Sequence, residues 1–182
     1  MRIIGGKHKG RKIFAPKNLP VRPTTDITKE SLFNMIQSRF FFDEISVLDL
    51  FSGTGNIVFE FASRGTPEIV AVDKHPASIS FIKKTAQKLN MPIETVQSDV
   101  FQFLNFAAHK QFDIIFADPP YQMNEKDWFK LIDMIFENNW LTENGIFVLE
   151  HHKTKDFSKH PHFVRSKKYG QTRLSVFENK EI

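Results

Sequence analysis

Strand-type and helix-type apolar patterns alternate along most of the chain. Strand-type runs cover residues 45–50, 68–72, 93–97, 112–117 and 146–149. Between these runs, apolar residues recur at three- and four-residue spacing and predict helices. The clearest helix is opened by Pro76 and has Ile79, Ile82, Ala86 and Leu89 on one side. Repeated strand–helix units predict an α/β fold with a parallel sheet, helices on both faces and right-handed crossovers.

The two ends of the chain depart from this alternation. The predicted strands 163–168 and 172–177 are separated only by Tyr169-Gly170-Gln171, which predicts an antiparallel hairpin. Near the start, short apolar pairs surround two glycines and the basic stretch 7–12, which predicts a small β-hairpin with a basic turn. Prolines then predict an extended linker, and they are Pro16, Pro20 and Pro23.

A helix is expected from about Asp26 onward. Thr25 or Asp26 supplies its N-cap, because short polar side chains accept hydrogen bonds from the first N–H groups of a helix. The residues expected to face the core are Ile27, Leu32, Phe33 and Ile36. The Phe40-Phe41-Phe42 run is expected to bury at least two rings.

The composition is that of an ordinary globular protein, with 41% hydrophobic and 25% charged residues over 182 positions. This length favours one domain, residues 1–182, made of a basic hairpin and linker (1–25) and a catalytic body (26–182). Neither a signal peptide nor a membrane span is predicted, so the expected location is the cytoplasm. Cysteine is absent, which excludes disulfides, thiolate metal sites and thiolate nucleophiles.

The formal net charge of +4 conceals a strong segregation. Residues 1–25 carry seven Lys or Arg and no acid, and residues 26–150 carry ten bases and eighteen acids. Residues 151–177 carry seven bases and one acid, Asp156. Because Lys and Arg that neutralise phosphates release counterions, an acidic body with basic ends favours a nucleic-acid partner.

Four of the predicted strands end in an acidic residue, and these are Asp49, Asp73, Asp99 and Asp118. Ligands of parallel α/β sheets bind at the carboxyl ends of the strands, so these carboxylates are expected along one edge of the sheet. An alternative interpretation is that Asp49, Asp73 and Asp99 only cap helices or solubilise the surface and do not bind a ligand.

Gly53 and Gly55 follow the first strand and indicate the kind of ligand at this edge. A dinucleotide site would need a third glycine near position 58, where this chain has a valine. An adenosine with an amino-acid tail fits better, since the glycines allow close approach and Asp73 can accept both ribose hydroxyls. Asp99 and Val100 can meet the adenine amine and ring. S-adenosylmethionine is such a ligand, and it is the predicted cofactor.

Asp118-Pro119-Pro120-Tyr121 closes the strand 112–117 and predicts the reactive site. Two prolines fix φ at about −65° and remove two N–H donors, so the backbone there can only accept hydrogen bonds. A planar base with an exocyclic amine suits this rim. The amine donates to the Asp118 carboxylate and the Pro119 carbonyl, while Tyr121 stacks on the ring. A Pro-Pro pair without these flanks would indicate only a strand-ending turn.

Six blocks of the chain resemble, in order and spacing, the RsmD-type 16S rRNA (guanine-N2)-methyltransferases. They are Arg2-Ile3-Ile4-Gly5-Gly6, Gly10-Arg11-Lys12, Arg22-Pro23-Thr24-Thr25-Asp26, Asp49-Leu50-Phe51-Ser52-Gly53-Thr54-Gly55, Asp118-Pro119-Pro120-Tyr121 and Lys168-Tyr169-Gly170-Gln171-Thr172. The glycine loop and the DPPY block are shared by many methyltransferases, whereas the first and third blocks are more particular to this family. The resemblance implies a class I (Rossmann-like) methyltransferase fold with a seven-stranded, mostly parallel sheet.

The resemblance also implies an activity and the residues for it. S-adenosylmethionine would donate a methyl group to the N2 amine of one guanine in 16S rRNA, presented by an assembled or partly assembled small subunit. The expected catalytic residues are Asp118, Pro119, Pro120 and Tyr121. The expected cofactor-binding residues are Thr24, Thr25, Asp49, Phe51, Gly53, Gly55, Asp73, Lys74, Asp99 and Val100. The expected RNA contacts are Arg2, Lys7, Lys9, Arg11, Lys12, Lys167 and Lys168.

Three departures from the family pattern are modest. Asn56-Ile57-Val58 follows the glycine loop where family members commonly have small residues and a further glycine. Lys29 stands where arginine is common, and Asp73 stands where glutamate is frequent. Neither of these two replacements removes a needed charge or acceptor.

Other functions stay open on the sequence alone. They are methylation of adenine N6 or of another amine such as a protein glutamine, dinucleotide-dependent oxidoreduction, and non-catalytic binding of rRNA as an assembly factor. The protein is expected to be a monomer without a metal site. The histidines at 151, 152, 160 and 162 are interpreted as solvated or RNA-facing residues.

Overall fold

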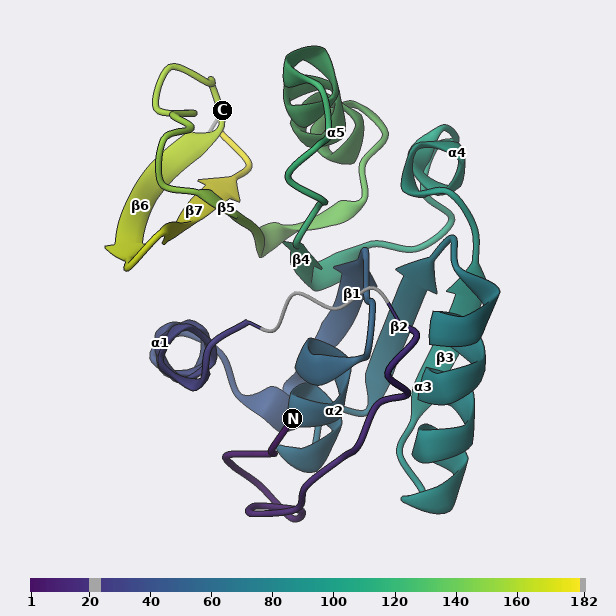
Figure 1. Cartoon of the computed structure of the whole chain (residues 1–182). Helices are drawn as coiled ribbons and strands as arrows, with labels where there is room; N and C mark the ends of the chain where they lie inside the picture. The colour runs from purple at the N-terminus through teal and green to yellow at the C-terminus, as the bar shows by residue number, and fades with distance from the viewer. Residues whose placement is uncertain (20–23, 181–182) are drawn as a thin grey trace.

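The computed structural model describes residues 1–19 and 24–180 (Figure 1). Seven strands form one sheet in the order β3-β2-β1-β4-β5-β7-β6. The strands are β1 (Ser46–Leu50), β2 (Glu68–Asp73), β3 (Ile93–Gln97), β4 (Phe112–Ala117), β5 (Leu141–His152), β6 (Phe163–Tyr169) and β7 (Thr172–Glu178). The first five strands are parallel, and β7 pairs antiparallel with both β5 and β6. The α/β fold and the C-terminal hairpin are therefore confirmed.

Helices cover both faces of this sheet. They are α1 (Asp26–Gln37), α2 (Asn56–Ser63), α3 (Pro76–Lys88), α4 (Val100–Leu104) and α5 (Glu125–Glu137), with a 3₁₀ turn η1 (Phe42–Glu44). Alternate residues of one strand enter different cores: Val47 packs with α1, α2 and α3, whereas Leu48 packs with α4 and α5. Because both faces are buried, the central strands are continuously apolar in sequence.

The N-terminal segment forms a less regular hairpin than the sequence predicts. Its pairing is limited to one antiparallel bridge between Arg2 and Lys12, with Ile3 N donating to the Arg11 carbonyl at 2.9 Å. This segment, residues 1–13, is called the N-terminal arm below. In Figure 1 it lies beside α2, and its turn lies below that helix, away from the arrowheads of β1 and β2. Of the predicted linker, Pro20, Arg22 and Pro23 lie outside the described residues.

Buried charges anchor the arm to α1 and α2. Lys29 of α1 and Glu60 of α2 have side chains only 1% and 0% exposed, and Lys29 Nζ lies 3.3 Å from Glu60 Oε2. Lys29 Nζ also donates to the Arg2 carbonyl at 2.7 Å, and Ile4 N donates to Glu60 at 3.1 Å. Arg64 completes the group with a 3.0 Å ion pair to the other Glu60 oxygen. The arm is thus held by a carboxylate shared between two cations.

Two sequence predictions about the first core are wrong in part. Ile27 is 71% exposed, because the buried side of α1 carries Lys29 with Leu32, Phe33 and Ile36, and Ile27 falls on the opposite side of the helix turn. Phe41 is 73% exposed, while Phe40 and Phe42 pack against the core as partly buried rings. None of the helices in the described part of the chain has the length and apolar character needed to span a bilayer.

Candidate active site

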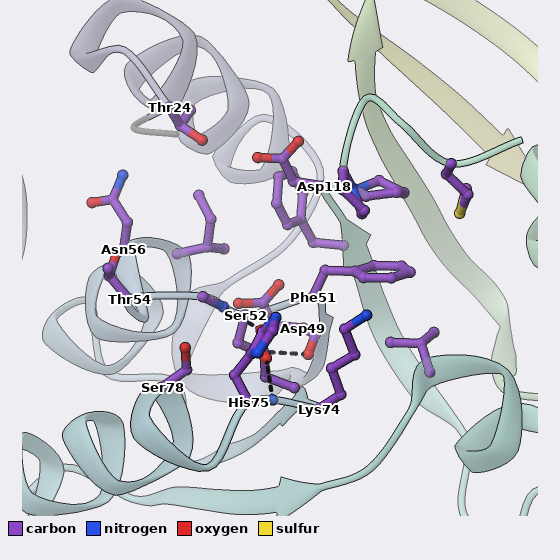
Figure 2. A pocket seen from close by; sticks show the side chains of 18 of the residues that line it. Thr24, Asp49, Phe51, Ser52, Thr54, Asn56, Lys74, His75, Ser78 and Asp118 are labelled. Carbon is purple, nitrogen blue, oxygen red and sulfur yellow. Dashed lines mark hydrogen bonds between the residues drawn. The ribbon is translucent and has the colours of Figure 1, made fainter. Parts of the chain in front are cut away.

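A cavity of about 960 Å³ opens at the carboxyl ends of β1, β2 and β4 (Figure 2). Figure 2 shows Thr24 and Asp118 on one side of the open space and Ser78, His75 and Lys74 on the opposite side. The predicted site residues that line it are Thr24, Asp49, Phe51, Gly53, Asp73, Lys74, Asp99, Val100, Asp118, Pro119, Pro120 and Tyr121. One cavity therefore joins the predicted cofactor residues and the predicted catalytic residues.

The glycine loop orients Asp73, which ends β2. Gly53 N donates to Asp73 Oδ2 at 2.8 Å, and His75 N donates to Oδ1 at 2.9 Å. Gly53 has φ of 55°, a left-handed conformation that glycine adopts without strain. Each carboxylate oxygen has two lone pairs, so both oxygens of Asp73 can still accept a hydroxyl from a ligand.

Asp49 is a buried acid without a hydrogen-bond partner for one of its oxygens. Its side chain lies at the end of β1, the residue is 2% exposed, and Oδ2 has no partner among the described residues. Burial raises the pKa of Asp49 well above its ordinary value, and the nearby Asp73 and Glu150 carboxylates raise it further. A cationic ligand group beside Oδ2 would offset both effects.

Asp99 has a structural function whether or not it binds a ligand. Its Oδ1 caps α4 by accepting from Phe101 N at 2.9 Å and from Gln102 N at 3.1 Å. Val100 is 3% exposed and lies beside it on the cavity wall. The helix-cap alternative is therefore correct for this acid, and the cap fixes the carboxylate at the edge of the cavity.

Two predicted cofactor residues do not line the cavity. A Cβ on Gly55, which has φ of 84°, would lie 2.7 Å from the Phe59 ring, so this glycine is required by the packing of α2. Thr25 caps α1, with Oγ1 accepting from Thr28 N at 3.2 Å. Both residues shape the site through the helices that they begin.

Asp118-Pro119-Pro120-Tyr121 follows directly on β4. Asp118 is half-buried, Pro119 is buried, and Tyr121 is 40% exposed. The Tyr121 ring meets the ring of His152 edge to face, with 5.7 Å between centroids and 88° between planes. His152 is the last residue of β5, so a rigid strand supports the aromatic side of this rim.

The sequence did not identify several residues of the cavity wall. Asn56 begins α2, and its Oδ1 accepts from Lys29 Nζ at 3.0 Å, which links the cavity to the buried ion group. Ser78 is 1% exposed, and its Oγ has no partner in the described part of the chain. The only signal for either residue is its position in the first turn of a helix after an acid-ended strand. The others are Met1, Ala15, Asp26, Ser52, Thr54, Ile57, His75, Phe101, Phe116, Gln122 and Met123.

The predicted RNA contacts fall into separate groups. Arg2 lies near the cavity and forms an ion pair with Asp26 at 3.4 Å. The backbone of Lys12 forms the β-bridge with Arg2 in the arm. Lys7 N donates to the carbonyl of Ser63, the last residue of α2, so the turn of the arm lies at the end of α2 away from the cavity. Lys9 is exposed in the same turn. The remaining contacts, Arg11 of the arm and Lys167 and Lys168 of β6, are also exposed.

The interpretation of the histidines as solvated is wrong for His151 and His160. His151 is 0% exposed, with Nε2 2.7 Å from Ser175 Oγ and Nδ1 2.9 Å from the His152 carbonyl. Burial lowers the pKa of His151 to about 4, and neighbouring Arg173 and Lys155 also lower it. His160 is 9% exposed and pairs with Asp133 at 3.0 Å. Within residues 1–19 and 24–180 no cluster of three or more potential metal ligands is present.

The sheet order and the site at its carboxyl edge define the class I methyltransferase fold. Hypothetical protein TTHA0928 of Thermus thermophilus has a TM-score of 0.84 and 27% identity, with coverage of 98% of this chain and 99% of that one. RsmC of the same organism, solved with S-adenosylmethionine and guanosine, has a TM-score of 0.68 at 22% identity, covers 89% of this chain and 45% of that one, and shows the fold alone.

Sequence comparison identifies the family. The model of the family described as "Conserved hypothetical protein 95" matches residues 1–178. YlbH of Bacillus subtilis is 33% identical over 187 residues, with coverage of 99% of this chain and 100% of that protein. Ribosomal RNA small subunit methyltransferase D of Haemophilus influenzae is 31% identical over 159 residues, with coverage of 85% and 80%. The chain belongs to this RsmD-type family of methyltransferases.

S-adenosylmethionine is the methyl donor of this class, and the cavity fits it. The unpartnered Asp49 Oδ2 suits the positively charged end of the donor, and Asp73 suits a pair of hydroxyls. Ser78 Oγ is a further buried polar atom that a ligand would satisfy.

Proposed function

We propose that this enzyme methylates the exocyclic N2 amine of a guanine in small-subunit rRNA, at the DPPY site, within an assembled or partly assembled subunit. The observation that carries the proposal is that Asp118–Tyr121 and the three acids Asp49, Asp73 and Asp99 surround one cavity. The relatives named ribosomal RNA small subunit methyltransferase D support rRNA as the substrate.

The residues at this rim favour direct transfer to an amine. When bound, the donor supplies an activated methyl group on a sulfonium, so the chain mainly has to position the amine. In-line placement contributes up to about 7 to 11 kcal/mol in model reactions. Asp118 and the Pro119 carbonyl accept from the amine and stabilise the positive charge that develops on it. Tyr121 stacks on the flipped base, which contributes about 1 to 3 kcal/mol.

Direct transfer also agrees with the residues that are absent from the sequence. Addition to a ring carbon would require a cysteine nucleophile, and the chain has no cysteine. The proton lost from the amine can pass to solvent at the half-exposed end of the cavity beside Tyr121.

The product identifies the base. Labelled S-adenosylmethionine is incubated with small subunits and with naked rRNA that lack the modification, and the digested nucleosides are separated. Label in N2-methylguanine is the expected result. Label in N6-methyladenine would contradict guanine as the target, and absence of label from both RNA forms would contradict the rRNA substrate.

Substitution of Asp118 tests the site. We expect Asp118→Ala to reduce transfer by at least a hundredfold, because the amine loses its charged acceptor, while RNA binding changes less than twofold. Transfer is measured with labelled donor, and RNA binding is measured by fluorescence anisotropy. Equal losses of both would show that Asp118 has a structural function.

A further inference from the structure

The C-terminal hairpin β6–β7 lies against the rim of the cavity through β5. Tyr121 contacts His152, and His152 pairs with Thr172, the first residue of β7. The next residue, Lys153, donates its N–H to the Gln171 carbonyl at 2.8 Å. The turn that joins β6 to β7 therefore lies at the carboxyl edge of the sheet, beside the residue proposed to stack on the target base.

Basic side chains lie on both faces of this end of the hairpin, because Lys167 and Lys168 are neighbours in β6. Lys168 lies directly opposite Arg173 in the β6–β7 ladder, and like charges in that position are destabilising. In the described part of the chain, no carboxylate forms an ion pair with Lys153, Lys167, Lys168 or Arg173. The only acid of residues 151–177, Asp156, accepts from Ser158 N and attracts Arg173 only at longer range, without an ion-pair contact.

The side chain of Arg173 is only partly satisfied. Its Nη1 donates to Ser166 Oγ at 3.0 Å, while the buried Nε has no partner among the described residues. Arg173 also lies opposite His151, whose pKa is lowered, so the row across β5, β7 and β6 contains no negative group. An anion at this row would relieve the repulsion between Lys168 and Arg173.

The distances suit an RNA strand that leaves the cavity. Neighbouring strands lie about 4.8 Å apart, so β6 is about 10 Å from β5 and from the residue that supports Tyr121. The turn of the N-terminal arm lies at a similar distance but in another direction, toward the edge of the sheet opposite to the cavity. Lys7 contacts the end of α2, and this helix of 8 residues is about 12 Å long from Asn56 at the cavity.

We propose that the turn end of the C-terminal hairpin, formed by Lys153, Lys167, Lys168 and Arg173, holds the RNA backbone next to the target nucleotide. It binds the phosphates that flank the base in the cavity, and the turn of the N-terminal arm is not needed for this contact. The proposal rests on RNA as the substrate of the site.

Three double variants test the assignment. Lys167→Gln with Lys168→Gln changes the hairpin, and Lys7→Gln with Lys9→Gln changes the turn of the arm. Lys83→Gln with Lys84→Gln is the matched control, because both lysines are exposed on α3 and the charge change is the same. Binding of an rRNA fragment is measured by fluorescence anisotropy at several salt concentrations. Methyl transfer is measured with labelled donor, and donor affinity is measured by calorimetry.

The hairpin variant is expected to bind RNA more weakly than wild type and to raise the KM for RNA by at least tenfold. Its affinity for the donor should not change. Its slope of log affinity against log salt should fall by about 1.4, for two lost contacts to a single strand. The arm variant and the α3 control should stay within twofold of wild type. A hairpin variant that matches the α3 control, or an arm variant with the larger loss, would overturn the proposal. If the wild type binds RNA but methylates none, the proposed function fails, and the binding series still decides the assignment.

Discussion

Two groups of buried ionisable residues lie beside α2, and they differ in whether the chain itself neutralises them. Toward the end of the helix, Glu60 is shared by Lys29 and Arg64, and each Glu60 oxygen has a cationic partner. Near its start, Asp49 is as deeply buried, yet Oδ2 has no partner in the part of the chain described. Since unsatisfied buried charge is costly, the first group holds the fold and the second marks the ligand site.

The largest expected effect is on the neutralised group. Glu60→Gln should lower the free energy of unfolding by about 3 to 5 kcal/mol, because Lys29 is left buried without its carboxylate. Urea unfolding measures the change. Glu68→Gln is the control, since it removes the exposed partner of Lys110 and should cost less than about 1 kcal/mol. Equal losses in the two variants would show that the buried group does not hold the fold.

His151 is a buried group that remains neutral, and pH tests it. Its pKa of about 4 lies below the ordinary value of 6.5, so between these pH values the unfolded chain binds a proton that the folded chain does not. Stability should therefore fall as the pH drops from about 6.5 to about 4, by up to about 3 kcal/mol from this residue. The measurement is urea unfolding at several pH values, in wild type and in His151→Gln. An identical pH dependence in both proteins would show that the pKa of His151 is not lowered in the folded protein.

Asp49→Asn should separate binding from stability. The variant removes an ionisable carboxyl group whose charged form is disfavoured by burial, so its free energy of unfolding should be equal to that of wild type or higher. Donor affinity should fall by about 10- to 150-fold, the loss of one charge-assisted hydrogen bond worth about 1.5 to 3 kcal/mol. Calorimetry with S-adenosylmethionine measures this, with Asp43→Asn on the surface as the control. Unchanged donor affinity would exclude Asp49 from the ligand site.

The smallest expected effect distinguishes the two neighbouring threonines. Thr25→Ala should lower the free energy of unfolding by about 1 kcal/mol, because α1 loses its N-cap, and donor affinity should not change. Thr24 lines the cavity and donates to Glu150 at 3.1 Å, so Thr24→Ala is the comparison variant for donor binding. A severalfold loss of donor affinity in Thr25→Ala would place this threonine in the ligand site after all.

The sequence predicts the edge of the sheet well because strand ends are a local property. Asp49, Asp73 and Asp118 follow runs that are typical of buried parallel strands, Asp99 follows the edge strand β3, and all four acids line the cavity. Local pattern also predicts the C-terminal hairpin, because only three residues separate its predicted strands and only two separate β6 from β7 in the structure. The core side of α1 is less well predicted. The apolar pattern places Ile27 toward the core, whereas in the structure Lys29 is buried there.

Features that depend on distant pairs cannot be predicted in this way. The position of the arm along α2 depends on Glu60, which accepts from Ile4 56 positions away in sequence and pairs with Lys29 of α1. Asn56 and Ser78 enter the cavity wall only because the first turns of α2 and α3 meet there. No sequence pattern indicates these contacts. The contacts of Glu60 also explain why the turn of the arm lies away from the cavity.

The basic residues of β6 have a second consequence, for solubility. As the last strand of the sheet, β6 presents one row of unpaired backbone groups, to which a strand of another molecule could add. Val164 is 49% exposed on this edge, and the exposed charges of Arg165 and Lys167 oppose such addition. Replacing these bases by apolar residues would therefore favour aggregation through edge-to-edge pairing, even in the absence of RNA.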